Sequence, residues 1–231
     1  MNTSQIRGLD LHKIQYRIKK QANWFLKRCL DLSICILILP FALLIMAIIC
    51  LLIVLDSHGS PIYVQERVGK CGKPFRIFKF RSMKIGDADT SERNFMQAYI
   101  QGNIRISEMT GGKAKYKPNN MDRITRVGRL LRKTSLDELP QIFNIIRGEM
   151  SLVGPRPNVP WEVACYNDWH FQRLETLPGI TGLAQIHGRS ELTFDEIVKY
   201  DVEYIERQSL LLDLNILWNT VICVLNRQGA G

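Results

Sequence analysis

The chain has 231 residues, of which 46% are hydrophobic, and a formal net charge of +9 at pH 7. This length and composition suit a single domain with a buried core, and they exclude a disordered chain and a transporter with many membrane spans. The excess of Lys and Arg favours an anionic partner, such as a nucleic acid, an acidic lipid or a phosphorylated small molecule.

Residues 32–55, 24 positions, contain no charged side chain. A helix of that length is about 36 Å long, enough for a hydrocarbon core of about 30 Å, so a transmembrane span is the simplest interpretation. Two features argue for another path. Pro40 predicts a kink, and the segments on both sides are rich in Lys and Arg, which prefer the cytoplasm. The alternative is a re-entrant helix that bends at Pro40 and leaves on the side from which it entered.

The six cysteines form no Cys-x-x-Cys pair, and three of them, Cys29, Cys35 and Cys50, lie in or beside this apolar segment. The four histidines are scattered along the chain. Neither a zinc site nor a disulfide framework is indicated. We therefore expect reduced cysteines that serve packing, which fits the cytoplasmic side of a membrane.

The next segment predicts a β-hairpin. Residues 62–64 and 75–80 are rich in β-branched and aromatic side chains, and a stretch of Gly, Lys and Pro separates them. Residues 86–120 are polar and lack a firm periodicity, so we expect a surface insertion that includes one short helix around residues 95–100.

Two helices are expected after the insertion. Residues 123–133 have apolar side chains on one helical face and basic ones around the other. Such a helix lies either on an anionic membrane surface or, with its basic face in water, against the protein core. A second helix is predicted from about residue 137 to residue 147, ending at Gly148.

Two further helices are expected near the C-terminus. Residues 194–208 predict a helix capped by Thr193, with Glu196 at the capping-box position. The last apolar stretch, residues 210–225, is interrupted by polar side chains and is too short for a membrane span. We expect it to lie at the membrane interface or in the core.

Asp137 and Glu138 are adjacent carboxylates that follow a cluster of Arg and Lys. One of them can attack phosphorus as a nucleophile while the other binds a metal, because hard oxygen ligands suit Mg²⁺. The main alternative is structural. Ser135 and Glu138 match a capping box, and acidic residues favour the first turn of a helix through its dipole.

Two other places offer cations for an anion. Arg156 stands between Pro155 and Pro157, so it loses little freedom when its guanidinium binds a phosphate. Lys79 and Arg81 would share one face of a strand and form a two-cation site. A solvated loop and the wet side of a hairpin are the respective alternatives.

The sequence contains no Walker-type loop, no Gly-x-Gly-x-x-Gly, no Gly-x-Ser-x-Gly and no zinc-protease pattern. It also lacks zinc fingers, heptads and ribonucleoprotein-type strand signatures, so we expect no nucleic-acid partner. The residues alone therefore indicate a basic, membrane-attached, single-domain protein with candidate anion and metal sites, and they do not specify a reaction.

Seven segments follow one another in a characteristic order: Lys27-Arg28-x-x-Asp31, residues 79–83, residues 124–133, residues 134–141 with Asp137-Glu138-Leu139-Pro140-Gln141, residues 150–157 with Gly154-Pro155-Arg156-Pro157, residues 178–185, and residues 200–204. Together they resemble the bacterial sugar transferase family, the monotopic polyprenol-phosphate phosphoglycosyl transferases. The resemblance extends over nearly the whole chain from about residue 24. Seven segments in order are far more specific than any one of them.

The resemblance implies an α/β, mostly helical, monotopic membrane protein with an N-terminal re-entrant helix kinked at Pro40, a short β-hairpin and amphipathic interfacial helices. It divides the chain into a basic segment with the re-entrant helix, residues 1–58, and a catalytic domain, residues 59–231. It also implies a place on the cytoplasmic face of the bacterial inner (plasma) membrane.

The resemblance further implies that Asp137 attacks the sugar-bearing phosphorus of a uridine-diphosphate (UDP) sugar and releases uridine monophosphate (UMP). Undecaprenyl phosphate would then accept the phosphosugar from the aspartyl intermediate, which begins a capsule, exopolysaccharide or other glycoconjugate. Glu138 is implied as the Mg²⁺ ligand. The implied phosphate-binding residues are Lys79, Arg132 and Arg156, with Arg81 beside Lys79 from the strand argument, and Asp201 matches a further active-site acid. A homo-oligomer is left open.

Two rival functions stay open. A glycosyltransferase that moves only the sugar would release a nucleoside diphosphate and would need no carboxylate nucleophile. A non-catalytic, basic membrane adaptor would use Asp137 and Glu138 only to cap a helix.

Overall fold

The computed structural model describes residues 3–84, 90–102, 123–188 and 192–225. Over these ranges the protein is mostly helical with two short two-stranded sheets, as the predicted fold class requires. Its helices are α1 (Thr3–Asp56), α2 (Thr90–Ile100), α3 (Arg126–Thr134), α4 (Ile142–Arg147), α5 (Pro160–Val163), α6 (Leu183–Ile186), α7 (Phe194–Arg207) and α8 (Leu210–Leu225). The strands are β1 (Ile62–Val68), β2 (Pro74–Phe80), β3 (Ser151–Val153) and β4 (Gly179–Thr181), and the 3₁₀ helices are η1 (Lys70–Gly72), η3 (Leu136–Gln141) and η4 (Asp168–Glu175).

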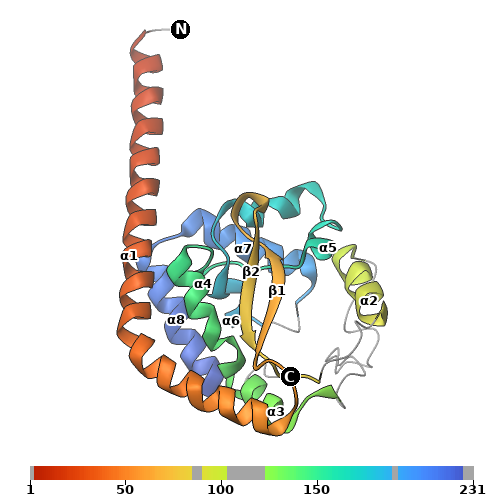
Figure 1. Ribbon diagram of the computed structural model, residues 1–231. Coiled ribbons are helices and arrows are strands. Elements are labelled where there is room, and N and C mark those ends of the chain that lie inside the picture. The colour runs from red at the N-terminus through yellow and green to blue at the C-terminus, as the bar shows by residue number, and fades with distance from the viewer. Residues whose placement is uncertain (1–2, 85–89, 103–122, 189–191, 226–231) are drawn as a thin grey trace.

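Helix α1 runs along one side of the body formed by the other elements, and its N-terminal part projects beyond that body (Figure 1). Pro40 lies inside this helix without ending it. The helix changes direction along its length and turns beneath the body (Figure 1). A proline inside a helix removes a backbone hydrogen bond and favours such a bend. Within the described residues, the part Asn23–Asp56 is long and apolar enough to cross a membrane by length and composition.

The apolar part of α1 has two different faces, and one of them belongs to the main hydrophobic core. Its inward side chains recur at helical spacing and pack with the hairpin and α4: Cys35, Ala42, Met46, Ile49 and Ile53. The opposite face is exposed and equally apolar, with Leu37, Phe41 and Leu55 among its side chains. A helix with an apolar exposed face along its length fits contact with lipid better than contact with water.

The motif Lys27-Arg28-x-x-Asp31 fastens α1 to three parts of the body. Lys27 Nζ donates to Asp213 Oδ2 of α8 at 2.8 Å, and both side chains are buried. Arg28 Nη2 donates to the Ile146 carbonyl of α4, and Asp31 Oδ1 accepts from the Leu152 amide of β3. The motif therefore has a clear structural role in docking α1.

The other end of α1 is attached to the same body. Asp56 Oδ2 accepts from the Val127 amide in the first turn of α3. Arg81, directly after β2, donates to the carbonyls of Ser57 and His58 at 2.6 and 2.7 Å. These bonds satisfy the carbonyls of the two residues that follow α1. Both terminal nitrogens of Arg81 are thus engaged by the segment after α1 and are not available to an anion beside Lys79, while its buried Nε has no acceptor among the described residues.

The predicted hairpin is confirmed. β1 and β2 pair antiparallel, with Ile62 opposite Phe80 and Val68 opposite Pro74. Helix α4 docks on β2 through Asn144, whose amide accepts from the Phe78 N–H and donates to the Arg76 carbonyl. Because Asn144 is fully buried, these bonds fix α4 at one position along the strand.

The segment before α4 differs from the prediction of one helix over residues 137–147. The chain first forms the 3₁₀ helix η3 and becomes α-helical only at Ile142. Pro140 has no N–H to donate to an α-helical hydrogen bond, which favours the tighter turn before it. Ser135 has a left-handed backbone (φ 57°) that ends α3, and its side chain makes no capping bond. The predicted Ser135–Glu138 capping box is therefore wrong.

The C-terminal half is held by a close backbone approach that the sequence analysis missed. β3 and β4 pair in parallel, and Gly154, just after β3, faces Gly179 at the start of β4. A Cβ on Gly179 would lie 2.1 Å from the Gly154 nitrogen, so this crossing has no room for a side chain. It sets the position of the Pro155–Pro157 loop.

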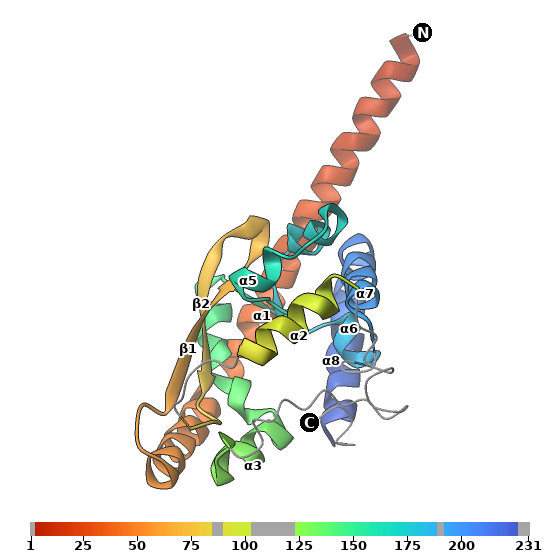
Figure 2. The ribbon, with the colours of Figure 1, turned by 90° about the vertical axis from the view of Figure 1, so that its right-hand side faces the viewer.

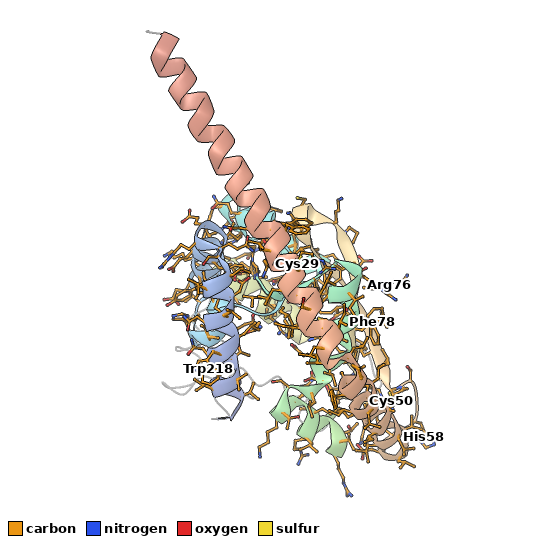
Figure 3. The ribbon with its side chains drawn as sticks, turned by 90° about the vertical axis from the view of Figure 1, so that its left-hand side faces the viewer. Cys29, Cys50, His58, Arg76, Phe78 and Trp218 are labelled. Atoms are coloured by element: carbon orange, nitrogen blue, oxygen red, sulfur yellow. The ribbon has the colours of Figure 1, made fainter. Side chains whose placement is uncertain are left out.

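The remaining helices agree largely with expectation. The Thr193 capping box with Glu196 is confirmed at the start of α7. Helix α8 buries Asp213 and Ile216 and exposes Leu211 and Trp218, so it is both core and apolar surface. Figure 3 views the face that α1 and α8 share, where Trp218 lies.

Helix α2 supplies the short helix expected within residues 86–120, and Figure 2 shows it crossing the side of the body near α5. The rest of that predicted insertion, residues 86–89 and 103–120, lies outside the described residues.

Replacing Lys27 by Met should lower the free energy of unfolding by about 3–5 kcal/mol, because it leaves Asp213 as a buried charge without its cation. Thermal and denaturant unfolding of the full chain in detergent measures this. Arg207→Met is the matched control, since it breaks an exposed pair with Glu203 on one helix and should cost at most about 0.5 kcal/mol. Equal effects of the two substitutions would contradict a docking role for Lys27.

Candidate active site

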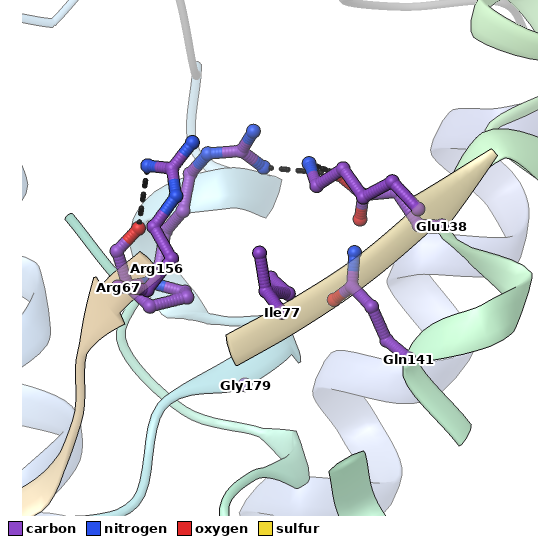
Figure 4. Close-up of a pocket in the computed structure, with 8 residues that line it drawn as sticks. Arg67, Ile77, Glu138, Gln141, Arg156 and Gly179 are labelled. Atoms are coloured by element: carbon purple, nitrogen blue, oxygen red, sulfur yellow. Dashed lines mark hydrogen bonds and ion pairs between the residues drawn. The ribbon is translucent and has the colours of Figure 1, made fainter. Parts of the chain in front are cut away.

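A small pocket lies where β2, η3 and the loop after β3 meet (Figure 4). Basic side chains and a buried amide dominate its wall. The lining residues are Arg67, Ile77, Lys79, Glu138, Gln141, Arg156, Pro157 and Gly179. Three of them, Lys79, Glu138 and Arg156, are residues that the sequence analysis singled out, and the fold brings them together from separate segments.

Glu138 is the centre of this cluster. Its Oε1 accepts from Lys79 Nζ at 3.0 Å and from Arg156 Nη1 at 3.3 Å. Burial alone would raise the pKa of Glu138, but the charges and hydrogen bonds of Arg156 and Lys79 outweigh it and lower the pKa to about 2. Glu138 is therefore ionised at neutral pH. Lys79 and Glu138 are mostly buried, whereas the Arg156 side chain is 52% exposed and leaves the rim open to a ligand.

Asp137 is partly buried beside this cluster. Desolvation raises its pKa, and the neighbouring charge of Glu138 raises it further, against the opposing influence of Lys79, Arg132 and Arg156. A partly desolvated carboxylate surrounded by cations is less well hydrated than one in water. That setting suits a nucleophile that must approach an anionic phosphorus centre.

Arg132 approaches the site from the last turn of α3. Its Nε donates to Ser82 Oγ at 2.9 Å, and the rest of the side chain is exposed. It is therefore held near Asp137 while part of its guanidinium stays available, as a phosphate-binding role requires.

Asp201 is buried behind the pocket and does not line it. It is almost fully buried in α7, and its Oδ2 accepts from Arg173 at 2.7 and 2.9 Å. Arg173 also donates to Asn158 Oδ1, to the Tyr166 hydroxyl and to the Arg156 carbonyl. Asp201 thus orients Arg173, and Arg173 in turn holds the backbone of the loop that carries Arg156.

Three residues of this neighbourhood escaped the sequence analysis. Arg67 and Gln141 line the pocket, and Arg173 lies behind it. Gln141 is the last residue of the Asp137-Glu138-Leu139-Pro140-Gln141 motif, so its place in the motif was a usable signal. Arg67 and Arg173 stand in stretches with no local pattern, and only the tertiary structure places them at the site.

Asp137 and Glu138 offer too few ligands to hold a metal alone, but they fit a metal that is also bound by water and by a phosphate. Among the residues that the structure describes, no group of three or more His, Cys, Asp or Glu is placed to hold an ion. Mg²⁺ commonly binds one or two carboxylates and completes its shell with water and phosphate oxygens. Glu138, with Oε1 held by the two cations and Oε2 outside those ion pairs, fits that arrangement.

A sequence profile of bacterial sugar transferases matches residues 22–227. The chain belongs to the bacterial sugar transferase family. The matched region includes the docked part of α1, the hairpin, the acidic pair and the loop of Arg156, so the family covers the whole candidate site.

Curated relatives in this family are similar over most of the chain. The undecaprenyl-phosphate galactose phosphotransferase of Salmonella typhimurium is 40% identical over 220 residues, which cover 95% of this chain and 44% of the relative. The undecaprenyl-phosphate glucose phosphotransferase of Komagataeibacter xylinus is 36% identical over 223 residues, or 92% of this chain and 38% of the relative. The exopolysaccharide production protein ExoY of Rhizobium meliloti is 39% identical over 191 residues, or 83% and 80%. This chain thus spans less than half the length of each of the two phosphotransferases.

The depressed pKa of Glu138 predicts a pH-dependent contribution to stability. Because the folded pKa of about 2 lies below the ordinary value of 4.5, the contribution is present above about pH 4.5 and is lost as the pH falls toward 2. We expect Glu138→Gln to lower the unfolding temperature of the full chain at pH 7, and the difference from the native protein to shrink at pH 3.5. Glu203→Gln, at an exposed pair, is the control. A difference that stays constant between pH 7 and 3.5 would contradict the ion-pair role.

Proposed function

We propose that this sugar transferase moves a sugar 1-phosphate from a UDP-sugar to undecaprenyl phosphate and releases UMP. The observation that carries the proposal is the convergence of Lys79, Arg132 and Arg156 on the Asp137-Glu138 pair. A site for two phosphorylated substrates has to neutralise several negative charges, and this one provides cations on three separate segments. The product would begin an exopolysaccharide, a capsule or another glycoconjugate.

The proposed chemistry proceeds in two displacements at one phosphorus. A carboxylate oxygen of Asp137 forms a bond to the sugar-bearing phosphorus, the bond to the UMP oxygen breaks, and UMP leaves with that electron pair. An oxygen of undecaprenyl phosphate then attacks the same phosphorus. The bond between that phosphorus and the Asp137 oxygen breaks, and the Asp137 carboxylate is regenerated. A covalent intermediate separates two encounters between anions that would otherwise coincide.

The other residues have supporting roles in this proposal. Lys79 and Arg156 hold Glu138 in place and offer donors to phosphate oxygens, and Arg132 does the same from α3. Glu138 would hold Mg²⁺, which supplies positive charge to the phosphates of the bound donor. Asp201 acts through Arg173, since its contacts lie behind the Arg156 loop.

The local geometry also favours catalysis over the adaptor alternative. That alternative needs Asp137 and Glu138 to cap a helix, but Ser135 makes no capping bond and Glu138 is bound to two cations. A carboxylate that is desolvated but caps no helix is a candidate for a functional residue.

We also propose that α1 is re-entrant and that the protein lies on the cytoplasmic face of the bacterial inner membrane. The support is that both ends of its apolar segment are fastened to one body, at Lys27 and at Asp56. The apolar outer faces of α1 and α8 would be in lipid, with Trp218 near the headgroups.

The names of the relatives include galactose in one case and glucose in another. The proposal therefore concerns the reaction class, and the sugar is to be found by assay.

Purified full chain, incubated with Mg²⁺, polyprenyl phosphate and a panel of UDP-sugars, should release UMP with the cognate donor. Asp137→Asn should reduce this release by more than about a thousandfold while the protein stays folded, because the amide is not a nucleophile. Nucleotide products separated by chromatography give the readout. Release of UDP in place of UMP would contradict phosphosugar transfer and support the sugar-only rival.

The raised pKa of Asp137 predicts the pH at which activity falls on the acid side of the pH–activity profile, the acid limb. A nucleophilic carboxylate works only when it is ionised, so kcat/KM should fall at a pH above the ordinary value of 3.8 for an aspartate. Initial rates of UMP release between pH 8 and 4 measure the limb, with unfolding followed at each pH. Arg132→Gln removes one of the cations that lower this pKa, so the limb should move to higher pH. A limb that stays in place in Arg132→Gln would argue against Asp137 as its source.

A further inference from the structure

Gln141 is a buried amide whose nitrogen has no hydrogen-bond acceptor among the described residues. It is 2% exposed at the end of η3, and its Nε2 is fully shielded from solvent. Figure 4 shows the amide directed into the pocket, beside Ile77 and below Glu138. Buried donors are nearly always paired, because an unpaired one loses its bond to water without replacement. Such a donor aimed into a pocket points to a ligand.

Arg67 provides a second unpaired donor on the same pocket wall. Its Nη1 and Nη2 donate to the Pro157 carbonyl and to Gln65 Oε1, which fixes the guanidinium, but its Nε is buried without an acceptor in the part of the chain that the structure describes. Figure 4 shows Arg67 alongside Arg156. Two fixed donors thus come from opposite ends of the pocket, one from β1 and one from η3.

The charges around the pocket call for an anion. Arg67, Lys79 and Arg156 face a single carboxylate in the lining, that of Glu138. Burial lowers the pKa of Lys79 and of Arg67, and in each case the charge of Arg156 lowers it further. The three cations therefore repel one another, and a negative oxygen among them would relieve that repulsion.

The chemistry of the wall selects the type of anion. Arg and Lys side chains can only donate, and the free group of Gln141 is also a donor. A phosphate oxygen can accept from several of these donors at once, and its negative charge offsets the cations, which a neutral sugar hydroxyl cannot do.

We propose that Gln141 and Arg67 form an inner phosphate subsite that binds the non-reacting oxygens of one substrate phosphate. The proposal rests on the proposed function for the identity of the substrates. The shared chemistry is a phosphate oxygen, supplied either by the diphosphate of the nucleotide sugar or by the polyprenyl phosphate. Gln141 and Arg67 bind and orient the substrate there, and Asp137 remains the group that reacts.

The test is ligand binding by the full chain in detergent, without turnover. Calorimetric titrations with UDP, with a short-chain polyprenyl phosphate and with inorganic pyrophosphate compare native protein with Gln141→Met and Arg67→Gln. We expect Gln141→Met to weaken binding of pyrophosphate and of one of the two substrate-like ligands by about tenfold, the loss of one hydrogen bond to a charged group. The ligand affected identifies the source of the oxygen.

A second readout separates binding from structure. Gln141→Met removes no hydrogen bond that Nε2 makes to the described residues, so the unfolding temperature of the ligand-free protein should stay the same or rise. Gln172→Met and Arg76→Gln make the same chemical changes at exposed positions and should leave binding unchanged. Arg67→Gln keeps the inference testable if Gln141→Met does not fold.

The outcomes are distinct. Unchanged affinity for all three ligands in folded Gln141→Met and Arg67→Gln would overturn the subsite and indicate that a trapped water satisfies both donors. Loss of pyrophosphate binding in the variants would support the subsite even if the native protein released no UMP. In that case the proposed function would fail, and the phosphate subsite would stand.

Discussion

One carboxylate oxygen, Glu138 Oε1, accepts hydrogen bonds from Lys79 and from Arg156, which belong to segments far apart in the sequence. Without that charge the two cations would repel each other across the pocket, and Arg67 would add to the repulsion. The pairing therefore holds the end of the hairpin, the 3₁₀ turn and the loop after β3 in one arrangement. It also leaves the pocket with more positive than negative charge, so the scaffold that positions the acidic pair is already prepared for an anionic ligand.

The parts of the fold that could be predicted from sequence are those with a strong local cause. The uncharged run of residues 32–55 predicts a long helix, and α1 runs through it without ending at Pro40. The hairpin follows from two β-rich runs around a turn, and the start of α7 follows from Thr193 and Glu196, three residues apart. Lys79, Glu138 and Arg156 were identified individually, and the structure brings them together in the lining of one pocket.

The rest depends on contacts between distant segments, which no local pattern encodes. The sequence Ser-x-x-Glu fits a cap, yet the left-handed backbone at Ser135 and the proline at residue 140 direct the chain into a 3₁₀ turn and free Glu138 for its ion pairs. The partner of Asp201 is an arginine 28 residues away on another element. Arg81 looks like part of a cationic strand face, but its two terminal nitrogens donate to the carbonyls of Ser57 and His58, just after α1.

Helix α1 contributes five side chains to the main core, from Cys35 to Ile53, and these pack against the hairpin and α4. The chain is consequently not a catalytic head on a removable stalk. Cutting it near residue 58 would strip one wall from the core and expose Phe80 and Ile145, which are now buried. A water-soluble version of this protein would have to be engineered by replacing the apolar side chains on the outer surface of the helix with polar ones, with its inner surface left intact.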